Sequence, residues 1–305
     1  MISLLVAVVS LLVVVKSAEV LVGQAEALAK KLGVNDFMIG FTIVAFGTSL
    51  PELVSSIFSS IAGHNRLVVA NIIGSNITNL CLILGAVAIF ERYRIKKRDV
   101  DLNIPLNLAS LAIVWALGAV FGFRLTWAVG VSLVSFFLIL LILAKDYNHV
   151  ARRNKEYANY HTAYLLVSLI ALVLGGKFCI DGMIGMANTF KISETLLGYF
   201  FLALGTSLPE LATTWVAVKK HEEELGIGSI LGSNLFNLMF VLGVSTFIRP
   251  IELTAAIPDL GFLTMATLAT YAFAIRGRKY FFSKPEGLGL VAIYVLFVIM
   301  QIRKN

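Results

Sequence analysis

A seven-residue motif that occurs twice is the feature that most constrains the fold of this chain. The motif G-T-S-L-P-E-L occupies residues 47–53 and returns at residues 205–211. A second pair of related motifs, I-I-G-S-N-I-T-N-L and I-L-G-S-N-L-F-N-L, occupies residues 72–80 and 230–238. Both pairs are separated by the same 158 residues. The chain is therefore a duplication of one structural unit.

The composition indicates an integral membrane protein. Of the 305 residues, 58% are hydrophobic and 14% are charged, whereas a soluble domain has about 25% charged residues. The net charge of +7 comes from short basic clusters between apolar segments. That pattern is typical of loops that orient a protein in a bilayer. We therefore expect the lipid bilayer as a partner, and no nucleic acid.

The lengths of the apolar segments predict an all-α membrane protein with ten transmembrane helices. A bilayer core about 30 Å thick requires about 20 apolar residues per helix. The segments expected to cross the membrane are residues 3–28, 37–61, 67–90, 103–121, 126–144, 163–189, 195–218, 226–248, 257–275 and 286–302.

The loops between these segments carry an uneven share of Lys and Arg. One set of alternate loops holds 17 such residues and the other set holds 6. Basic loops stay in the cytoplasm. We therefore expect a multi-pass protein of the cytoplasmic (inner) cell membrane with both termini outside, whose first apolar segment is an uncleaved span.

The two halves of the chain are expected to be inverted relative to each other. The copies of the glutamate motif lie in the second and seventh predicted spans, five crossings apart. An odd number of crossings sends the copies through the membrane in opposite directions, which is an inverted repeat. Residues 1–145 would form the first five-helix repeat, residues 146–161 a cytoplasmic linker, and residues 162–305 the second, inverted repeat.

Each glutamate motif predicts a helix that is broken at the membrane midplane. Pro51 has no N–H to offer the carbonyl of Gly47, and Pro209 leaves Gly205 in the same situation. Irregular backbone at this depth is tolerated only where it is buried in protein or lines a wet cavity. We expect the freed carbonyls to face such a cavity.

The motifs supply oxygen ligands without thiolate or imidazole. Ser75 and Asn79 are four residues apart, so they can share a helix face, and inversion would bring both halves to one midplane cluster. Two carboxylates among neutral oxygens suit Ca²⁺, which takes about 6 to 8 oxygen ligands, better than Mg²⁺, which requires a tight octahedron. The candidate ligands are Glu52, Glu210, Asn79, Asn237, Thr48, Thr206, Ser49, Ser207, Ser75 and Ser233.

An empty site with two glutamates is costly to carry through a low-dielectric membrane core. It should change sides only when it is filled or protonated, which predicts obligatory exchange by an antiporter that is not an enzyme and has no cofactor. The alternatives are H⁺/Ca²⁺ antiport at the same site, a cation channel, which needs a continuous pore, and an intramembrane hydrolase, which needs a nucleophile or metal beside the glutamates. A structural role for the glutamates as buried, hydrogen-bonded residues is a further alternative.

At these residues the sequence resembles the calcium/cation antiporter superfamily, and most of all its prokaryotic sodium/calcium exchanger type. The resemblance rests on the paired G-T-S-L-P-E and G-S-N-x-x-N motifs and extends over the whole chain. It implies Ca²⁺ and Na⁺ as the transported ions, with Glu52 and Glu210 as central ligands and the other candidates in support. It also implies alternating access in which the first and sixth helices, residues 3–28 and 163–189, slide across the other eight.

The sequence departs from that family at Asn237. Many sodium/calcium exchangers carry an aspartate there, whereas this chain has an amide at both Asn79 and Asn237. Two titratable groups then remain in the site, so both H⁺ and Na⁺ stay open as the counter-ion. Proton/calcium exchangers usually show a G-N-x-x-E motif instead, which favours Na⁺. The sequence thus predicts export of Ca²⁺ in exchange for Na⁺, with one chain sufficient for transport.

Overall fold

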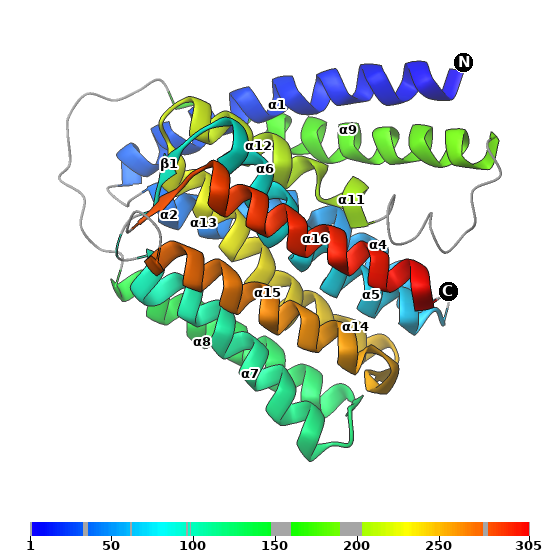
Figure 1. The fold of residues 1–305 in the computed structure, drawn as a ribbon. Helices are drawn as coiled ribbons and strands as arrows, with labels where there is room; N and C mark the ends of the chain where they lie inside the picture. The colour runs from blue at the N-terminus through cyan, green and yellow to red at the C-terminus, as the bar shows by residue number, and fades with distance from the viewer. Residues whose placement is uncertain are drawn as a thin grey trace.

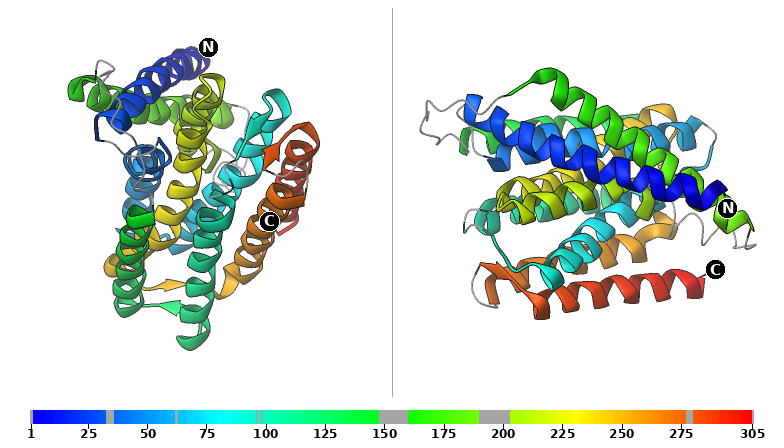
Figure 2. Two further views of the ribbon diagram at one scale, coloured as in Figure 1. Left: turned by 90° about the vertical axis from the view of Figure 1, so that its left-hand side faces the viewer. Right: turned by 90° about the horizontal axis from the view of Figure 1, so that it is seen from above.

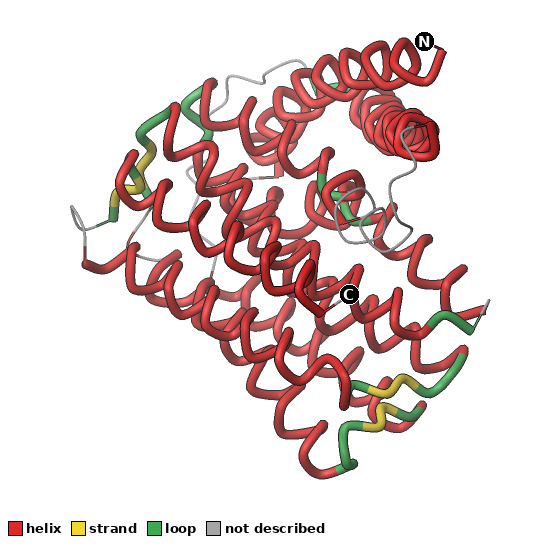
Figure 3. The backbone as a smooth tube through the Cα atoms, turned by 45° about the vertical axis from the view of Figure 1, so that its right-hand side comes forward, coloured by secondary structure: helices red, strands yellow, loops and turns green. Residues whose placement is uncertain are grey.

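The described residues of the computed structural model are almost all helical. They comprise residues 2–32, 36–61, 63–95, 97, 99–147, 160–189, 203–276 and 280–304. Figure 3 shows the helices in red and the short strands in yellow. Residues 148–159 of the predicted linker and residues 195–202 of the seventh predicted span lie outside the described part. The prediction of a helical protein is confirmed.

The first half of the chain begins with one long helix and continues with interrupted ones. The interruptions are π-helical turns, labelled η1 to η3, and a single turn residue at position 49. The elements are α1 (Ile2–Leu32), α2 (Asp36–Ile39), η1 (Gly40–Val44), α3 (Ala45–Thr48), α4 (Leu50–Ile61), α5 (Asn65–Ile77), η2 (Thr78–Ile83), α6 (Leu84–Phe90), β1 (Tyr93–Arg94), η3 (Asp99–Asn103), α7 (Ile104–Val120), β2 (Arg124–Leu125) and α8 (Trp127–Tyr147).

The second half repeats this order. From α3 to β1, every element has a counterpart whose bounds are shifted by 158 residues, including the π-helical turn after the G-S-N motif. The elements are α9 (Thr162–Thr189), α11 (Ala203–Thr206), α12 (Leu208–Lys219), α13 (Glu223–Leu235), η5 (Phe236–Val241), α14 (Leu242–Ile248), β3 (Ile251–Glu252), η6 (Thr254–Ala256), α15 (Ile257–Arg276), β4 (Phe281–Phe282) and α16 (Lys284–Lys304). The duplication in the sequence is thus also a duplication of secondary structure.

Several described helices are long and apolar enough to cross a membrane. Five continuous segments meet this condition, and the bent pair Gly40–Thr48 and Leu50–Ile61 is a sixth. These helices make the chain a multi-pass membrane protein. Helical residues also fall within each of the ten predicted spans, but the crossing of the membrane by all ten stays a prediction. The continuous segments are Asn65–Phe90, Val100–Val120, Glu223–Ile248, Thr254–Ile275 and Lys284–Arg303.

The helices that carry the G-S-N motifs form the centre of the bundle. The segments Asn65–Phe90 and Glu223–Ile248 are mostly buried, whereas α7, α15 and α16 are mostly exposed on their outer faces. The helices α1 and α9 pack against each other along one side of the molecule, away from α7 and α15 (Figures 1 and 2). Both described ends of the chain lie at the same end of the bundle.

Two glycines allow backbones to come together near the centre. A Cβ atom on Gly232 in α13 would collide with the carbonyl of Phe41 in η1, and one on Gly40 would collide with the carbonyl of Leu225. Small residues permit this close approach of helices in a membrane. The contact places Ser233, the neighbour of Gly232, against the break that follows α3.

Two small antiparallel sheets connect the halves of the chain. Strand β1 pairs with β4, and β2 pairs with β3. In the repeat, β1 is equivalent to β3, and β2 is equivalent to β4. The sheet formed by β1 and β4 is therefore equivalent to the sheet formed by β3 and β2. The two sheets lie at opposite ends of the bundle in Figure 3.

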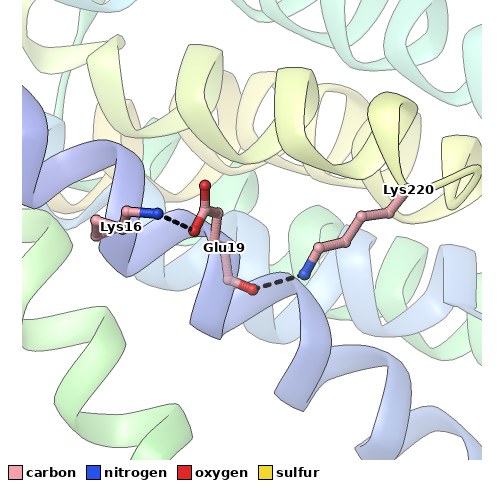
Figure 4. Close-up of polar contacts among 3 residues, drawn as sticks. All are labelled: Lys16, Glu19 and Lys220. Carbon is pink, nitrogen blue, oxygen red and sulfur yellow. Dashed lines mark hydrogen bonds and ion pairs between the residues drawn. The ribbon is translucent and has the colours of Figure 1, made fainter.

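A hydrogen bond connects α1 to the turn between α12 and α13. The Lys16 ammonium forms an ion pair with Glu19 at 2.8 Å, and Lys220 Nζ donates a hydrogen bond to the backbone carbonyl of Glu19 at 2.9 Å (Figure 4). Gly23 lies about one turn after Glu19, and an added Cβ there would make an ordinary contact of 3.8 Å with Lys220 Nζ. The backbone N–H of His161, just before α9, donates to Gln24 Oε1 at 2.7 Å.

Candidate ion-binding site

The two glutamate motifs break their helices in the same way. Ser49 has φ −88° and ψ 9°, Ser207 has φ −88° and ψ 6°, and each ends one short helix just before the next begins. The helix axes bend by 48° at Ser49. A proline near the start of the following helix, Pro51 or Pro209, lacks the N–H that a continuous helix would use. The identical local sequence therefore produces an identical local structure.

One expectation about this break is wrong. The carbonyl of Gly47 was expected to be unpaired, but it accepts a backbone N–H at the end of α3. Because the chain turns at Ser49 instead of continuing as a straight helix, another N–H can take the place of the one that Pro51 lacks. The break therefore does not leave the Gly47 carbonyl unpaired, and the predicted ligands at the break are the side-chain oxygens of Thr48, Ser49 and Glu52.

All ten predicted ligand side chains are buried, with at most 2% of their surface exposed. They come from the two broken helices and from the two G-S-N helices. Most hydrogen bonds among them join one half of the chain to the other, such as Thr48 with Ser233 at 3.4 Å and the equivalent Thr206 with Ser75 at 3.4 Å. The structure thus brings together the residues that the repeat pattern selected.

The two central glutamates have different surroundings. Ser49 and Ser233 both donate hydrogen bonds to Glu210 Oε1, at 3.1 and 3.2 Å, while Glu210 Oε2 has no partner. Among the described residues, neither carboxylate oxygen of Glu52 accepts a well-formed hydrogen bond, although the hydroxyls of Thr206 and Ser75 lie near them. The hydroxyl of Ser207, the repeat equivalent of Ser49, likewise has no hydrogen-bond partner in the described part of the chain. The sequence repeat is nearly symmetric at these positions, but the hydrogen bonding is not.

Each of the two predicted ligand amides uses its NH₂ group on an asparagine of the other half. Asn79 Nδ2 donates to Asn234 Oδ1 at 3.0 Å, and Asn237 Nδ2 donates to Asn76 Oδ1 at 3.2 Å. The Oδ1 atoms of Asn79 and Asn237 have no hydrogen-bond partner among the residues that the structure describes. Both residues lie in π-helical turns, η2 and η5, and such turns occur frequently at functional sites.

The unpaired atoms of this cluster match the needs of a hard cation. Buried polar atoms without partners are rare because no hydrogen bond offsets the free-energy cost of removing them from water. This cost is greatest for buried carboxylates. A Ca²⁺ ion takes about 6 to 8 oxygen ligands in flexible geometry. The unpaired oxygens of the cluster are Glu52 Oε1, Glu52 Oε2, Glu210 Oε2, Asn79 Oδ1, Asn237 Oδ1 and Ser207 Oγ.

The cluster has few ionisable ligands. Among the residues that the structure describes, no group of three or more His, Cys, Asp and Glu side chains is placed to hold a metal ion. A cation in this cluster would therefore meet two carboxylates and otherwise neutral oxygens. That composition suits Ca²⁺ or an alkali cation and not a soft transition metal.

Sequence reasoning missed one residue of this cluster. Asn71 donates from Nδ2 to the backbone carbonyl of Glu52 at 3.3 Å and to Ser56 Oγ at 3.2 Å, and its Oδ1 accepts a hydrogen bond from Thr206 at 3.5 Å. Its position four residues before Ser75, on the same helix face, was the signal that could have found it. The repeat equivalent is Ser229, so Asn71 is specific to the first half.

Comparison with known proteins links the whole chain to ion exchangers. The model of the sodium/calcium exchanger protein family matches residues 2–145 and 160–303. A putative antiporter, CaxA of Alkalimonas amylolytica, is 32% identical over 287 residues, covering 88% of this chain and 89% of that protein. The sodium/calcium exchanger MaX1 of Methanosarcina acetivorans is 28% identical over 323 residues, covering 90% and 91%.

A solved structure has the same fold. The sodium-calcium exchanger NCX_Mj, in crystals soaked with Na⁺ and Ca²⁺, superimposes with a TM-score of 0.86 at 25% sequence identity, over 98% of each chain. The similarity therefore includes both halves of the chain and the motifs in each.

Proposed function

Because the chain belongs to the sodium/calcium exchanger protein family, we propose that it is a secondary active antiporter that exchanges Ca²⁺ for Na⁺ at one site near the membrane midplane. The observation that carries this proposal is the cluster of buried, unpaired oxygens on Glu52, Glu210, Asn79 and Asn237. These oxygens come from both halves of a single chain. One chain would therefore suffice for transport.

The charge of the cluster supports Ca²⁺ as the exported ion. Two carboxylates balance one Ca²⁺, and the neutral oxygens of Asn79, Asn237 and Ser207 would raise its coordination number toward the number that Ca²⁺ prefers. Na⁺ uses the same kind of oxygen ligand, so the two ions would compete. Without either ion, the cluster would hold two uncompensated charges, and the change of side would be slow.

An inverted repeat of five and five helices would supply alternating access. The constant offset of 158 residues between equivalent elements and the exchange of partners between the two small sheets support this arrangement. The helix α9, which we propose slides together with α1, lies against the candidate site. A Cβ on Gly47 would collide with Leu169 of α9, so this helix packs directly on the broken helix that presents Thr48 and Ser49.

H⁺/Ca²⁺ exchange is the second candidate function, and a specific observation favours it. Both amide positions, Asn79 and Asn237, are neutral, so Glu52 and Glu210 are the carboxylates of the predicted ligand set. On the return step of an H⁺/Ca²⁺ exchanger, these two groups would carry the protons. The Na⁺ and H⁺ proposals use the same residues. They differ in which ion neutralises the two glutamates on the return step.

Calcium flux into proteoliposomes tests both candidates. The membrane potential is clamped, and an outward gradient of Na⁺ is imposed in one set of vesicles and a pH gradient in the other. We expect Na⁺-driven uptake of Ca²⁺. Uptake driven by the pH gradient alone would replace the Na⁺ proposal with H⁺/Ca²⁺ exchange, and flux without any ion on the opposite side would indicate a channel.

Glu52→Gln and Glu210→Gln should each abolish Ca²⁺ exchange in this assay, because each variant removes half of the negative charge of the site. Glu91→Gln, in the loop after α6, is the matched control and should exchange Ca²⁺ at the normal rate. Near-normal transport by either site variant would rule out the proposed ligand set.

A further inference from the structure

A reciprocal pair of asparagines lies where the two G-S-N helices meet. Asn76 Nδ2 donates to the backbone carbonyl of Asn234 at 3.2 Å, and Asn234 Nδ2 donates to the backbone carbonyl of Asn76 at 3.4 Å. The two residues are equivalent in the repeat, 158 positions apart, and at most 1% of either is exposed. The pair therefore joins α5 to α13 across the junction of the halves.

These two bonds leave each Oδ1 atom as a fixed acceptor. An asparagine amide has an NH₂ side that only donates and an oxygen side that only accepts. Since Asn76 and Asn234 use their NH₂ groups on each other's backbone, their oxygens must face elsewhere. They face the NH₂ groups of the ligand amides: Asn234 Oδ1 accepts from Asn79, and Asn76 Oδ1 accepts from Asn237.

We propose that Asn76 and Asn234 are positioning residues that turn the amide oxygens of Asn237 and Asn79 toward the transported cation. An amide whose NH₂ is held on one side presents its oxygen on the other, and those two oxygens are unpaired. Without the acceptor, the amide of Asn79 or Asn237 is free to turn and present its NH₂ to the cation, which repels it. The inference rests on the proposed function, because it concerns ligands of the same cation.

The pairing is crossed between the halves. Asn79 of the first half is oriented by Asn234 of the second, and Asn237 of the second half is oriented by Asn76 of the first. At both Asn76 and Asn234, the side-chain NH₂ group donates one hydrogen bond and the side-chain oxygen accepts another. An aspartate there lacks the donor, and a serine is too short to occupy the same places. The crossed pattern predicts that substitutions of Asn234 and Asn79 are coupled, and that substitutions of Asn76 and Asn237 are coupled.

A set of double-mutant cycles tests this pattern. The measurement is Ca²⁺ affinity of the purified full chain in detergent, by equilibrium binding of radioactive Ca²⁺ and by the rise in unfolding temperature with added Ca²⁺. Asn234→Ala and Asn76→Ala should each weaken Ca²⁺ binding by about 10- to 100-fold, as the loss of residues that orient metal ligands typically does.

The coupling of these effects distinguishes positioning from a general structural role. In an Asn79→Ala background there is no amide to orient, so Asn234→Ala should change the affinity by less than about two-fold, since residues that act through one another are not additive. In an Asn237→Ala background, Asn234→Ala should keep its full effect. Asn76→Ala should give the mirror result, with its effect lost only when Asn237 is replaced.

A second variant keeps the test decisive if Asn76→Ala and Asn234→Ala do not fold. Asn234→Asp retains an oxygen that accepts from Asn79 but cannot donate to the carbonyl of Asn76. Asn79→Ala should weaken Ca²⁺ binding in this background by the same factor as in the unmodified protein, because Asn79 is still oriented. If Asn79→Ala has no effect in the Asn234→Asp background, the orientation depends on the link between α5 and α13, and the positioning proposal is wrong.

The possible failures can be told apart. If the unmodified chain does not bind Ca²⁺, the proposed function is wrong and the positioning inference falls with it. If the unmodified chain binds Ca²⁺ but the effects of Asn234→Ala and Asn79→Ala multiply, the exchanger proposal stands and only the positioning inference is overturned.

Discussion

At the scale of single residues, the site is less symmetric than its sequence. The Glu210 carboxylate accepts hydrogen bonds from Ser49 and Ser233. Among the described residues, the Glu52 carboxylate and the hydroxyl of Ser207, the repeat equivalent of Ser49, have no such hydrogen bond. The structure therefore distinguishes two carboxylates that occupy the same position in two copies of one motif. In this conformation, the hydroxyls of Thr206 and Ser75 lie near the Glu52 carboxylate, but among the described residues neither of its oxygens accepts a well-formed hydrogen bond. Glu52 therefore depends more than Glu210 on a cation to offset its burial.

The two serines of the broken helices should differ in their contribution to stability. Ser49→Ala removes a hydrogen bond to Glu210, which should lower the free energy of unfolding by about 1 kcal/mol without added ions. Ser207→Ala is the matched control, since its hydroxyl has no partner, and it should have a smaller effect. Reversible unfolding in detergent with an ion chelator measures both, and equal losses would contradict the asymmetry.

Asn237→Asp should change the ion preference or the pH dependence of exchange. The variant adds a third carboxylate to the cluster, and the aspartate cannot donate to Asn76 Oδ1 as the amide does at 3.2 Å. A third carboxylate binds an extra cation when it is ionised and a proton as the pH falls, so exchange should become more sensitive to acidic pH. Rates of Ca²⁺ uptake between pH 5 and 9 measure this; an unchanged profile would mean that position 237 does not face the ions.

At the scale of helices, the helix that is broken at Ser49 packs directly against α9. Gly47 lies two residues before the break at Ser49 and against Leu169 of α9, with no room for a Cβ. Position 47 therefore requires glycine because a larger side chain does not fit, and not because the backbone has an unusual conformation there. At Gly23 in α1, by contrast, an added Cβ would lie 3.8 Å from Lys220 Nζ, which is an ordinary van der Waals distance.

Gly47→Ala should destabilise the protein by about 1 to 3 kcal/mol, the usual cost of overpacking a filled contact, and should slow exchange because it pushes α9 away from the site. The double variant Gly47→Ala with Leu169→Ala should recover stability, because the shorter side chain makes room for the new methyl group. Gly23→Ala is the control and should unfold like the unmodified chain. Unfolding temperature and initial rates of Ca²⁺ uptake measure both effects, and a double variant no better than the single one would exclude Leu169 as the cause.

At the scale of the whole molecule, the two small sheets show how the halves interlock. Strand β1 of the first half pairs with β4 of the second, and β3 of the second half pairs with β2 of the first. The pairs lie at opposite ends of the bundle (Figure 3). In an inverted repeat, these ends would face opposite sides of the membrane.

Cysteines placed in the two sheets should label from opposite sides. In a background without Cys81 and Cys179, Arg94→Cys in β1 should react with an impermeant thiol reagent from the cytoplasmic side, and Arg124→Cys in β2 from the outside. Both side chains are exposed in the structure. Intact cells and inside-out vesicles separate the two directions. Labelling of both positions from the same side would exclude the inverted arrangement.

Much of this architecture could be predicted from the sequence because it depends on local rules. The duplicated motifs located both breaks, since proline and glycine act on the backbone within a few residues, and the apolar lengths located the helical segments. The repeat also selected the ten ligand candidates, because buried polar groups in apolar spans need a reason to be there. Asn71 was missed because its equivalent in the second half is Ser229, which removed the repeat as a signal.

The tertiary structure decided which oxygen faces which partner. Ser49 bonds Glu210, 161 residues away, and not the nearby Glu52, and the ligand amides are held by asparagines of the opposite half, 155 and 161 residues away. Contacts of this range depend on how helices cross, which no local pattern specifies. The sequence by itself determined the composition of the site, because chemistry and spacing are properties of the chain; the orientation of its oxygens and the inequality of its two glutamates arise only when both halves pack together.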